Sequence, residues 1–312
     1  MSGESATVFG LDVSAEVSLP FLEGGAAEPT GRPLELLVHA GAAEALEWPA
    51  GSELISDQVL PDGSVSFRIE AHPDVGYLIW GPAYGAHRLS GDGRSLECFP
   101  QGVGAAGWQR LLVAQVLPFA AVLNGLEVFH ASAVVIDGHA VAILGRSGGG
   151  KTSVALELCR RGASFLADDV LALECSGADL LGHPGSPVAG VAHAEVERQA
   201  PNPALGMTLA VNNREHLVRM RSAAAPAPLS ALFFLDRRAD GPSEPEFEPL
   251  ADVKPLLGAT FNFVLATPPR LGGLLEVCAR AAQLRVERVF AGPAVDPPEL
   301  SAALLKRLGG AE

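Results

Sequence analysis

The stretch GRSGGGKT at residues 145–152 constrains this chain more than any other feature. It matches the pattern GxxxxGK[ST] in full. Glycines let a loop wrap so closely that several backbone N–H groups point at phosphate oxygens, and the helix that follows presents its N-terminal N–H groups to the same anion. The stretch therefore predicts a strand, a phosphate-binding loop (P-loop) and a helix. A plain flexible glycine turn is the weaker alternative, because an apolar run precedes the stretch and an amphipathic one follows it.

The side chains of the loop have separate roles. Lys151 is expected to place a mobile charge on the β- and γ-phosphates, and the Thr152 hydroxyl can ligate Mg²⁺. ATP and Mg²⁺ are therefore the predicted cofactors. The predicted cofactor-binding residues are Gly145, Ser147, Gly148, Gly149, Gly150, Lys151, Thr152 and Ser153.

Composition narrows the class of protein. The 312 residues are 48% hydrophobic and 19% charged, as in a soluble globular protein. The formal net charge of −14 argues against nucleic-acid and anionic-membrane partners, which need basic surface. An ATP site must then be a local positive pocket in a negative protein.

Compartment signals point to the cytoplasm. The N-terminus MSGESATVFG has neither a basic nor an apolar segment of a secretion signal. The longest apolar run, Leu111–Leu123, is too short to cross a bilayer. Four widely spaced cysteines without a CxxC pair are expected to be buried free thiols.

The chain divides into two predicted domains. Residues 1–104 show short strands separated by turn residues, which predicts a β-rich N-terminal domain. A glycine-rich joint at 102–107 leads to an apolar helix, Trp108–Leu123, that is expected to end at Asn124-Gly125. Residues 105–312 form the second predicted domain, an α/β (α+β) domain around the P-loop.

A hairpin is expected to feed the P-loop. Ser132–Ile136 and His139–Leu144 are apolar, β-branched runs separated by Asp137-Gly138, a strong hairpin signal. A hairpin at this place implies a mixed sheet rather than a wholly parallel one. Further predicted elements are a helix from Thr152 to Arg161, a strand Leu229–Leu235, a loop Arg237–Glu248, a helix Leu271–Leu284, a strand Val286–Phe290 and a last helix Pro298–Leu308.

A carboxylate pair, Asp168-Asp169, lies between the apolar runs Phe165–Ala167 and Val170–Leu173. Successive strand residues point to opposite faces, so one carboxylate can hold Mg²⁺ while the other accepts a proton from an attacking hydroxyl. A solvated turn between two strands is the alternative. The position of the pair soon after the P-loop favours the functional interpretation.

The chain resembles the kinase domain of HPr kinase/phosphorylase and its relatives, in the branch of shorter homologues that includes lasso-peptide-associated kinases. The resemblance is carried by HASA at residues 130–133, the P-loop, and ALELCRRGASFLADDVLALE at 155–174. It implies an HPr-kinase-like P-loop fold preceded by a β-rich domain. The downstream signature of that family, Glu followed by Arg-Gly and a further Gly, has no counterpart here.

The resemblance also implies roles for single residues. Asp169 is the implied general base, with His130 and Lys151 as the other catalytic residues. Asp168 and Thr152 are the implied metal ligands. The alternative to a catalytic role for His130 is a structural one, in which its side chain caps or packs under the sheet. Roles for Arg219, Arg221 and His183 are left open by the sequence.

The sequence thus favours a kinase that transfers the γ-phosphoryl group of ATP to a Ser or Thr hydroxyl of a peptide or small protein, including a natural-product precursor peptide. A kinase for small-molecule hydroxyls such as a sugar is the first alternative, and a nucleotide-sensing module without transfer is the second. The sequence does not decide whether the N-terminal domain recognises the acceptor or forms a homo-oligomer.

Overall fold

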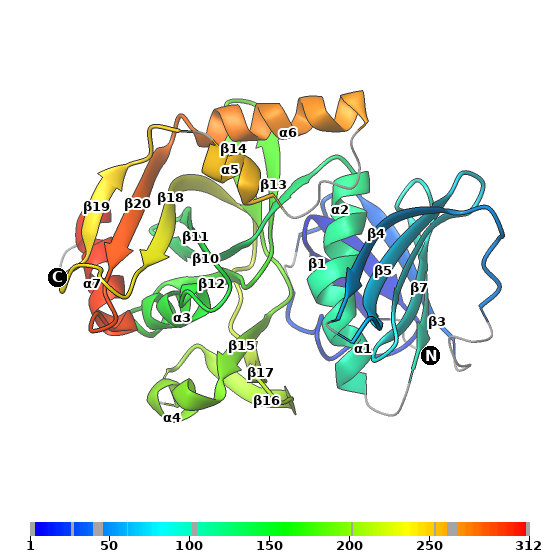
Figure 1. Cartoon of the computed structure of the whole chain (residues 1–312), viewed down its shortest axis with the longest axis horizontal. Helices are drawn as coiled ribbons and strands as arrows, with labels where there is room; N and C mark the ends of the chain where they lie inside the picture. The colour runs from blue at the N-terminus through cyan, green and yellow to red at the C-terminus, as the bar shows by residue number, and fades with distance from the viewer. Residues whose placement is uncertain are drawn as a thin grey trace.

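The structure is a computed structural model, which describes residues 4–25, 28–39, 46–60, 62–101, 105–200, 202–252, 254–260 and 267–309. It has a mixed α/β fold with three β-sheets (Figure 1). The N-terminal half is used below for residues 4–123, and the P-loop half for residues 127–309. No helix in the described ranges is long and apolar enough to span a membrane.

The N-terminal half is built on an eight-stranded sheet with the strand order β1-β2-β3-β8-β7-β6-β5-β4. The β2–β3 and β3–β8 pairs are parallel, and the other neighbours are antiparallel. The β-rich character predicted for this region is therefore confirmed. The strands are β1 (Glu4–Val8), β2 (Leu11–Ala15), β3 (Pro33–Val38), β4 (Glu53–Val59), β5 (Val65–His72), β6 (Gly76–Gly81), β7 (Gly85–Leu89) and β8 (Ser95–Pro100).

One continuous helical segment covers this sheet. It comprises α1 (Ala105–Leu111), the π-helical turn η2 (Leu112–Val116) and α2 (Leu117–Leu123). Pro118 has no N–H to donate to the preceding turn, which accounts for the irregular stretch before it. The segment ends at Asn124, and Gly125 has a φ of 84°, so the predicted left-handed helix end is confirmed.

The helical segment shares its core with the N-terminal sheet. Leu112, Val116 and Phe119 are fully buried in one hydrophobic cluster with sheet residues such as Leu36 and Ile79. The predicted domain boundary falls on residues 102–104, which lie outside the described residues. A division at 1–104 and 105–312 stays a prediction, but α1 to α2 packs as part of the N-terminal half.

The P-loop half is built on a nine-stranded mixed sheet with the path β12-β10-β11-β18-β14-β13-β9, and β20 joins β18 to β19. The β11–β18 and β18–β20 pairs are parallel. The strands are β9 (Glu127–Phe129), β10 (Ala131–Ile136), β11 (His139–Gly145), β12 (Ser164–Ala167), β13 (Leu171–Ser176), β14 (Asp179–His183), β18 (Ala227–Arg237), β19 (Glu246–Pro249) and β20 (Arg285–Ala291).

The predicted hairpin before the P-loop is confirmed. β10 and β11 are antiparallel, and Ile136 pairs with His139 across a two-residue turn. Asp137 and Gly138 have φ values of 49° and 78°, the left-handed pair that such a turn requires. The predicted loop Arg237–Glu248 is wrong at both ends, because β18 includes Arg237 and β19 begins at Glu246.

Helices cover both faces of the nine-stranded sheet. On β11, Val141 and Ile143 point to one face and pack against α3 (Lys151–Arg160) and α7 (Pro297–Leu308). Ala142 and Leu144 point to the other face, in the cluster of α5 (Lys254–Gly258) and α6 (Pro268–Ala281). The last three predicted elements, two helices and the strand between them, agree with α6, β20 and α7 to within three residues at each end.

A small third sheet in the P-loop half contacts the cores of both halves. It has the order β15-β17-β16, with β15 (Val188–Ala192), β16 (Leu205–Val211) and β17 (Glu215–Met220). A 3-10 turn, η3 (His193–Glu195), and α4 (Val196–Gln199) connect β15 to β16. Leu217 belongs to the core of the N-terminal half, while its neighbour Val218 belongs to a core of the P-loop half.

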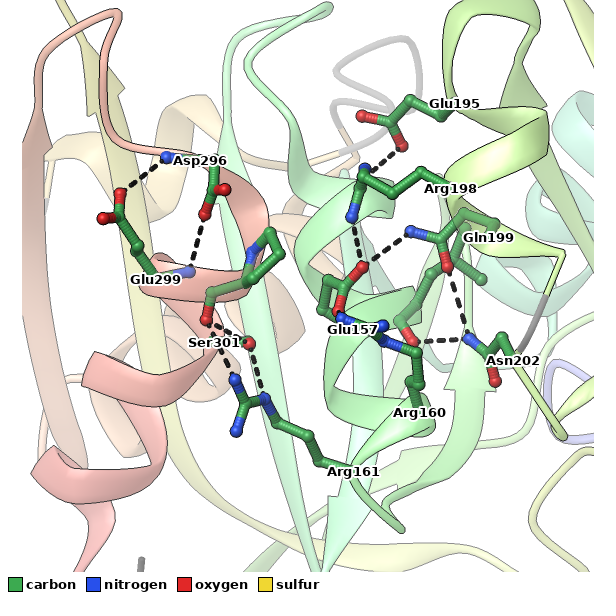
Figure 2. A network of polar contacts seen from close by, with 12 residues as sticks. Glu157, Arg160, Arg161, Glu195, Arg198, Gln199, Asn202, Asp296, Glu299 and Ser301 are labelled. Atoms are coloured by element: carbon green, nitrogen blue, oxygen red, sulfur yellow. Dashed lines mark hydrogen bonds and ion pairs between the residues drawn. The ribbon is translucent and has the colours of Figure 1, made fainter.

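A buried polar network fixes the helix that follows the P-loop. The Glu157 carboxylate on α3 is fully buried and accepts hydrogen bonds from Arg160, Arg198 and Gln199 (Figure 2). Asn202 donates to the Leu156 carbonyl oxygen at 2.7 Å. Arg161 Nε donates to Ser301 Oγ on α7 at 3.1 Å. The network ties α3 to α4 and α7. All four cysteines are free; Cys98, Cys159 and Cys278 are buried as predicted, whereas Cys175 is partly exposed.

Candidate functional site

The P-loop joins the buried end of β11 to the first turn of α3. Gly145, Gly148 and Gly150 have φ values of 142°, 74° and 91°. A residue with a side chain would be strained at such positive φ values, whereas glycine adopts them readily. A Cβ atom on Gly145 would lie 2.7 Å from the Leu235 carbonyl oxygen, so this position also has no room for one. The geometry explains why glycine stands at each of these places.

The N-terminus of α3 is built to receive an anion. Gly150 is its N-cap residue and provides no side chain to cap the first backbone N–H groups, and no acidic residue lies in the first turn. These N–H groups, which include those of Thr152 and Ser153, carry the positive end of the helix dipole. Lys151 Nζ donates to the carbonyl oxygens of Gly145 and Arg146 at 3.2 and 3.4 Å, so its ammonium group lies over the loop.

Asp168 is held against the P-loop by three donors. Its Oδ1 accepts hydrogen bonds from the hydroxyls of Thr152 and Ser132, both at 2.7 Å, and its Oδ2 accepts from the Gly190 N–H at 3.0 Å. Burial and the charge of Asp169 raise the pKa of the Asp168 carboxyl, while the hydrogen bonds oppose that shift. The structure thus brings together the two side chains that the sequence nominated as metal ligands.

Asp169 turns away from its neighbour. Its φ of 68° is in the left-handed region, which a residue other than glycine adopts rarely. Its Oδ2 lies 3.6 Å from Nη2 of Arg110, a residue of α1. His130 Nδ1 lies 3.4 Å from the backbone oxygen of Asp169. The strained bend therefore places the two adjacent carboxylates in different surroundings.

Several of these residues line one cleft of about 790 Å³, referred to below as the P-loop cleft, whereas Asp168 and Thr152 are not among its lining residues. His130, Lys151 and Asp169 line it together with the loop residues Gly145, Ser147 and Gly149. The volume is in the range of small-molecule sites. All three predicted catalytic residues thus lie on the walls of a single cavity.

The opposite wall was missed by the sequence analysis. It consists of Asp236, Arg237 and Arg238 at the end of β18, with Arg288 on β20. Because β11 and β18 are parallel, the end of β18 lies beside the P-loop. An Asp-Arg-Arg run directly after an apolar strand was the signal that could have identified it.

The P-loop cleft is locally positive. Arg146, Arg237, Arg238, Arg288 and Lys151 line it against two carboxylates, those of Asp169 and Asp236. The hydrogen bond from Arg238 lowers the pKa of the Asp236 carboxyl, and the charges of Arg288 and Arg146 add to that effect. In a chain with a formal net charge of −14, this is the kind of pocket that a polyphosphate requires.

The three residues of open role lie elsewhere. Arg219 donates to the Pro20 carbonyl oxygen at 2.8 Å and pairs with Glu23 at 2.7 Å, both in the N-terminal half. His183 is buried at the end of β14, and its Nε2 lies 2.8 Å from Glu174 Oε2. Arg221 follows β17 and does not line the P-loop cleft. None of these three residues lines the P-loop cleft.

Comparison with known proteins gives a family match for the segment that contains the P-loop. Residues 122–191 match the family model of the HPr serine kinase C-terminal domain. A search of curated proteins finds no match. Among solved structures, the HPr(Ser) kinase/phosphatase from Coxiella burnetii is similar at 15% identity, over 58% of this chain and 95% of that one. Its TM-score of 0.31 is too low to carry an argument.

The matched segment contains His130, the P-loop and the pair Asp168-Asp169. It therefore contains the residues of the P-loop, His130 and Asp169 that line the P-loop cleft, whereas residues 234–238, residues 255, 258 and 259 and Arg288 contribute the rest of the lining. Residues 122–191 of this chain are therefore similar to the HPr serine kinase C-terminal domain family.

Proposed function

We propose that this protein is an ATP-dependent kinase that transfers the γ-phosphoryl group to a Ser or Thr hydroxyl of a polypeptide. The observation that carries the proposal is the hydrogen bond from the P-loop hydroxyl of Thr152 to Asp168, with Asp169 next to it on the wall of the P-loop cleft. A phosphate cradle and a carboxylate pair are thereby parts of one site. Such a site suits phosphoryl transfer, where positioning and charge supply most of the rate.

ATP is proposed to place its phosphates on the P-loop. The N–H groups at the start of α3 and the Lys151 ammonium would hold the β- and γ-phosphates. Arg146, Arg237, Arg238 and Arg288 on the cleft walls would add positive charge around the same anion. Since ATP is supplied in the cytoplasm, we also propose that the protein acts there.

The residues present fit Mg²⁺. Thr152 and Asp168 offer a hydroxyl and a carboxylate oxygen that lie 2.7 Å apart, and oxygen ligands are those that Mg²⁺ prefers. Within the described ranges, no group of three or more His, Cys, Asp or Glu is arranged to hold a metal. This agrees with Mg²⁺ sites that use few protein ligands and complete the shell with phosphate and water. Bound there, Mg²⁺ would neutralise phosphate charge.

Asp169 is proposed as the general base. It would accept the proton of the acceptor hydroxyl while the hydroxyl oxygen bonds to the γ-phosphorus. The bond to the β,γ-bridging oxygen breaks, and ADP leaves with that electron pair. His130 would orient this segment, because its ring faces the Asp169 backbone oxygen at 3.4 Å.

The test is transfer from γ-labelled Mg-ATP to Ser-containing peptides, read by mass spectrometry as a gain of one phosphate. Lys151→Ala and Asp169→Asn are each expected to lower the rate by about 10³-fold, and Asp169→Asn is expected to keep ATP binding. Lys254→Ala is the matched control, because that side chain is 85% exposed and does not line the P-loop cleft.

Other outcomes would support the alternatives. Transfer to sugars or other small hydroxyl compounds, but to no peptide, would identify a small-molecule kinase. ATP binding without transfer, unchanged in Asp169→Asn, would identify a nucleotide-sensing module. Failure to bind ATP would contradict the proposal altogether.

A further inference from the structure

Asp169 borders two clefts. One is the P-loop cleft, and the other is a separate cleft of about 690 Å³, referred to below as the acceptor cleft. None of the P-loop residues 145–152 lines the acceptor cleft. A carboxylate between two cavities can take a proton from a group in one cavity while that group attacks a phosphate held in the other.

The walls of the acceptor cleft come from both halves of the molecule. Arg110, Leu111, Ala114 and Gln115 belong to the helical segment over the N-terminal sheet. The β4–β5 hairpin contributes Gln58, Leu60, Ser66 and Phe67, and the β16–β17 hairpin contributes residues 210–215. Figure 1 shows α1 and the β16–β17 hairpin, two of the elements that contribute these residues.

We infer that the acceptor cleft binds the acceptor as an extended polypeptide segment without net charge, with its Ser or Thr hydroxyl at Asp169. This inference rests on the proposed kinase function. It also assigns a role to the N-terminal half, which forms one wall of the peptide site.

Sheet edges beside the cleft support an extended chain. β4 is the end strand of the eight-stranded sheet, and β16 is the end strand of the three-stranded sheet. Edge strands offer backbone N–H and C=O groups to which an extended peptide can add. Two edges that border one cleft favour a polypeptide over a compact metabolite.

The side chains of the cleft have matching chemistry. Leu60 and Val211 are 46% and 57% exposed, which is high for large apolar residues, and both line the cleft. Gln58, Gln115, Asn212 and Asn213 add amide groups that can bond to peptide groups. A peptide with apolar residues close to its hydroxyl would cover Leu60 and Val211, and its backbone would form hydrogen bonds with the amide side chains.

Charge argues against an anionic acceptor. The charged residues of the cleft are Arg110, Arg214, Asp169 and Glu215, two of each sign. Arg110 Nη2 lies 3.6 Å from Asp169 and 3.4 Å from Glu215, so its charge is already shared between these carboxylates. A sugar phosphate or nucleotide acceptor would need an excess of cations such as the one that lines the P-loop cleft.

The experiment uses the full chain, γ-labelled Mg-ATP and a mixture of synthetic neutral peptides of about ten residues, each with one Ser and varied flanking positions. Leu60→Asp, Val211→Asp and their double variant change exposed side chains, so folding should be kept. Met207→Asp is the matched control, because Met207 is 64% exposed on the same strand β16 but does not line the acceptor cleft.

Peptides with apolar flanking residues are expected to be labelled preferentially. The double variant should raise the KM for the best peptide by about tenfold or more, while the KM for ATP and the values for Met207→Asp stay unchanged. An unchanged peptide KM in both cleft variants would overturn the inference. Labelling of small hydroxyl compounds instead of peptides would also overturn it.

The two proposals fail in different ways. Peptide labelling with a KM that is unchanged in the cleft variants would overturn the acceptor inference alone and leave the kinase function standing. Lys151-dependent ATP binding without any labelled peptide would overturn both the acceptor inference and the transfer to polypeptides, and leave the nucleotide site. If the wild-type protein does not bind ATP, both the acceptor inference and the proposed kinase function are overturned.

Discussion

The two halves of this molecule differ in the charged groups that they bury: among the described residues, buried carboxylates such as Glu157 lie in the P-loop half, and the buried polar residues of the N-terminal half are His87 and Gln109. In the P-loop half, Asp168 has three hydrogen-bond donors, and Glu157 is fully buried among Arg160, Arg198 and Gln199. In the N-terminal half, His87 is fully buried beside Cys98, and its Nε2 has no hydrogen-bond partner among the described residues.

This difference shows what each half has to position. Charged groups remain charged inside a protein only where partners compensate them, and such networks hold side chains in one geometry. The P-loop half uses them to orient a loop, a helix and a carboxylate pair. The N-terminal half buries a neutral imidazole in an apolar core and contributes to the site a surface together with the Arg110 guanidinium.

The largest expected effect concerns Asp168. Asp168→Asn removes the negative charge that faces Thr152, so we expect phosphoryl transfer to fall by about 10³-fold and the dependence of ATP affinity on Mg²⁺ to weaken. Transfer kinetics and calorimetric ATP titrations with and without Mg²⁺ measure both. Asp179→Asn, an exposed carboxylate on β14, is the control. Full transfer by Asp168→Asn would show that the P-loop half does not depend on this carboxylate.

The next effect is on stability. Glu157→Ala leaves Arg198 and Arg160 without their shared buried partner, so the free energy of unfolding should fall by about 3 kcal/mol. Glu276→Ala breaks an exposed pair with Arg280 and should change it by less than about 0.5 kcal/mol.

Fluorescence can assign this loss to one half. The three tryptophans, Trp48, Trp80 and Trp108, all precede residue 124 and report the N-terminal half, whereas circular dichroism reports both halves. Two separate transitions in Glu157→Ala would show that the halves unfold independently. A single coincident transition would show one cooperative unit. Equal stability losses in Glu157→Ala and Glu276→Ala would contradict the role given to the network.

The sequence predicted the P-loop region well because its signals are local. The hairpin at Asp137-Gly138 and the start of α3 depend on neighbouring residues, as does the left-handed glycine after α2. The Asp168–Thr152 contact could only be guessed, because it depends on how β12 is placed beside β10. The arginine wall was missed because it requires the parallel pairing of β11 with β18, two strands far apart in the chain. The acceptor cleft was missed because its walls come from two separate sheets, the helical segment α1 to η2, and Asp169.

The third expected effect is a loss of stability in the N-terminal half as the pH falls. Burial lowers the pKa of His87 from 6.5 to about 3, so the folded state holds the neutral ring while the unfolded chain takes up a proton. The stability contributed by the neutral form is full above pH 6.5 and is lost as the pH falls. Between pH 6.5 and pH 5 the free energy of unfolding should drop by about 2 kcal/mol.

Tryptophan fluorescence can follow this effect, since the Trp108 ring lies 6.3 Å from His87. His87→Leu should flatten the pH dependence, and His139→Gln, an exposed turn residue of the P-loop half, should leave it as in the wild type. Parallel pH profiles for wild type and His87→Leu would contradict this account.

The smallest expected effect lies where the halves meet. Arg110 comes from the N-terminal half, and its guanidinium lies 3.6 Å from the Asp169 carboxylate. Both side chains are partly exposed, at 28% and 45%, so the pair contributes no more than about 1 kcal/mol. Arg110→Gln should therefore lower kcat about fivefold and leave the KM for ATP unchanged, and Arg110→Lys should restore most of the rate. A merely structural role would lower stability and affect both constants. An unchanged kcat would mean that the N-terminal half forms a wall of the acceptor cleft but does not help to position the proposed base.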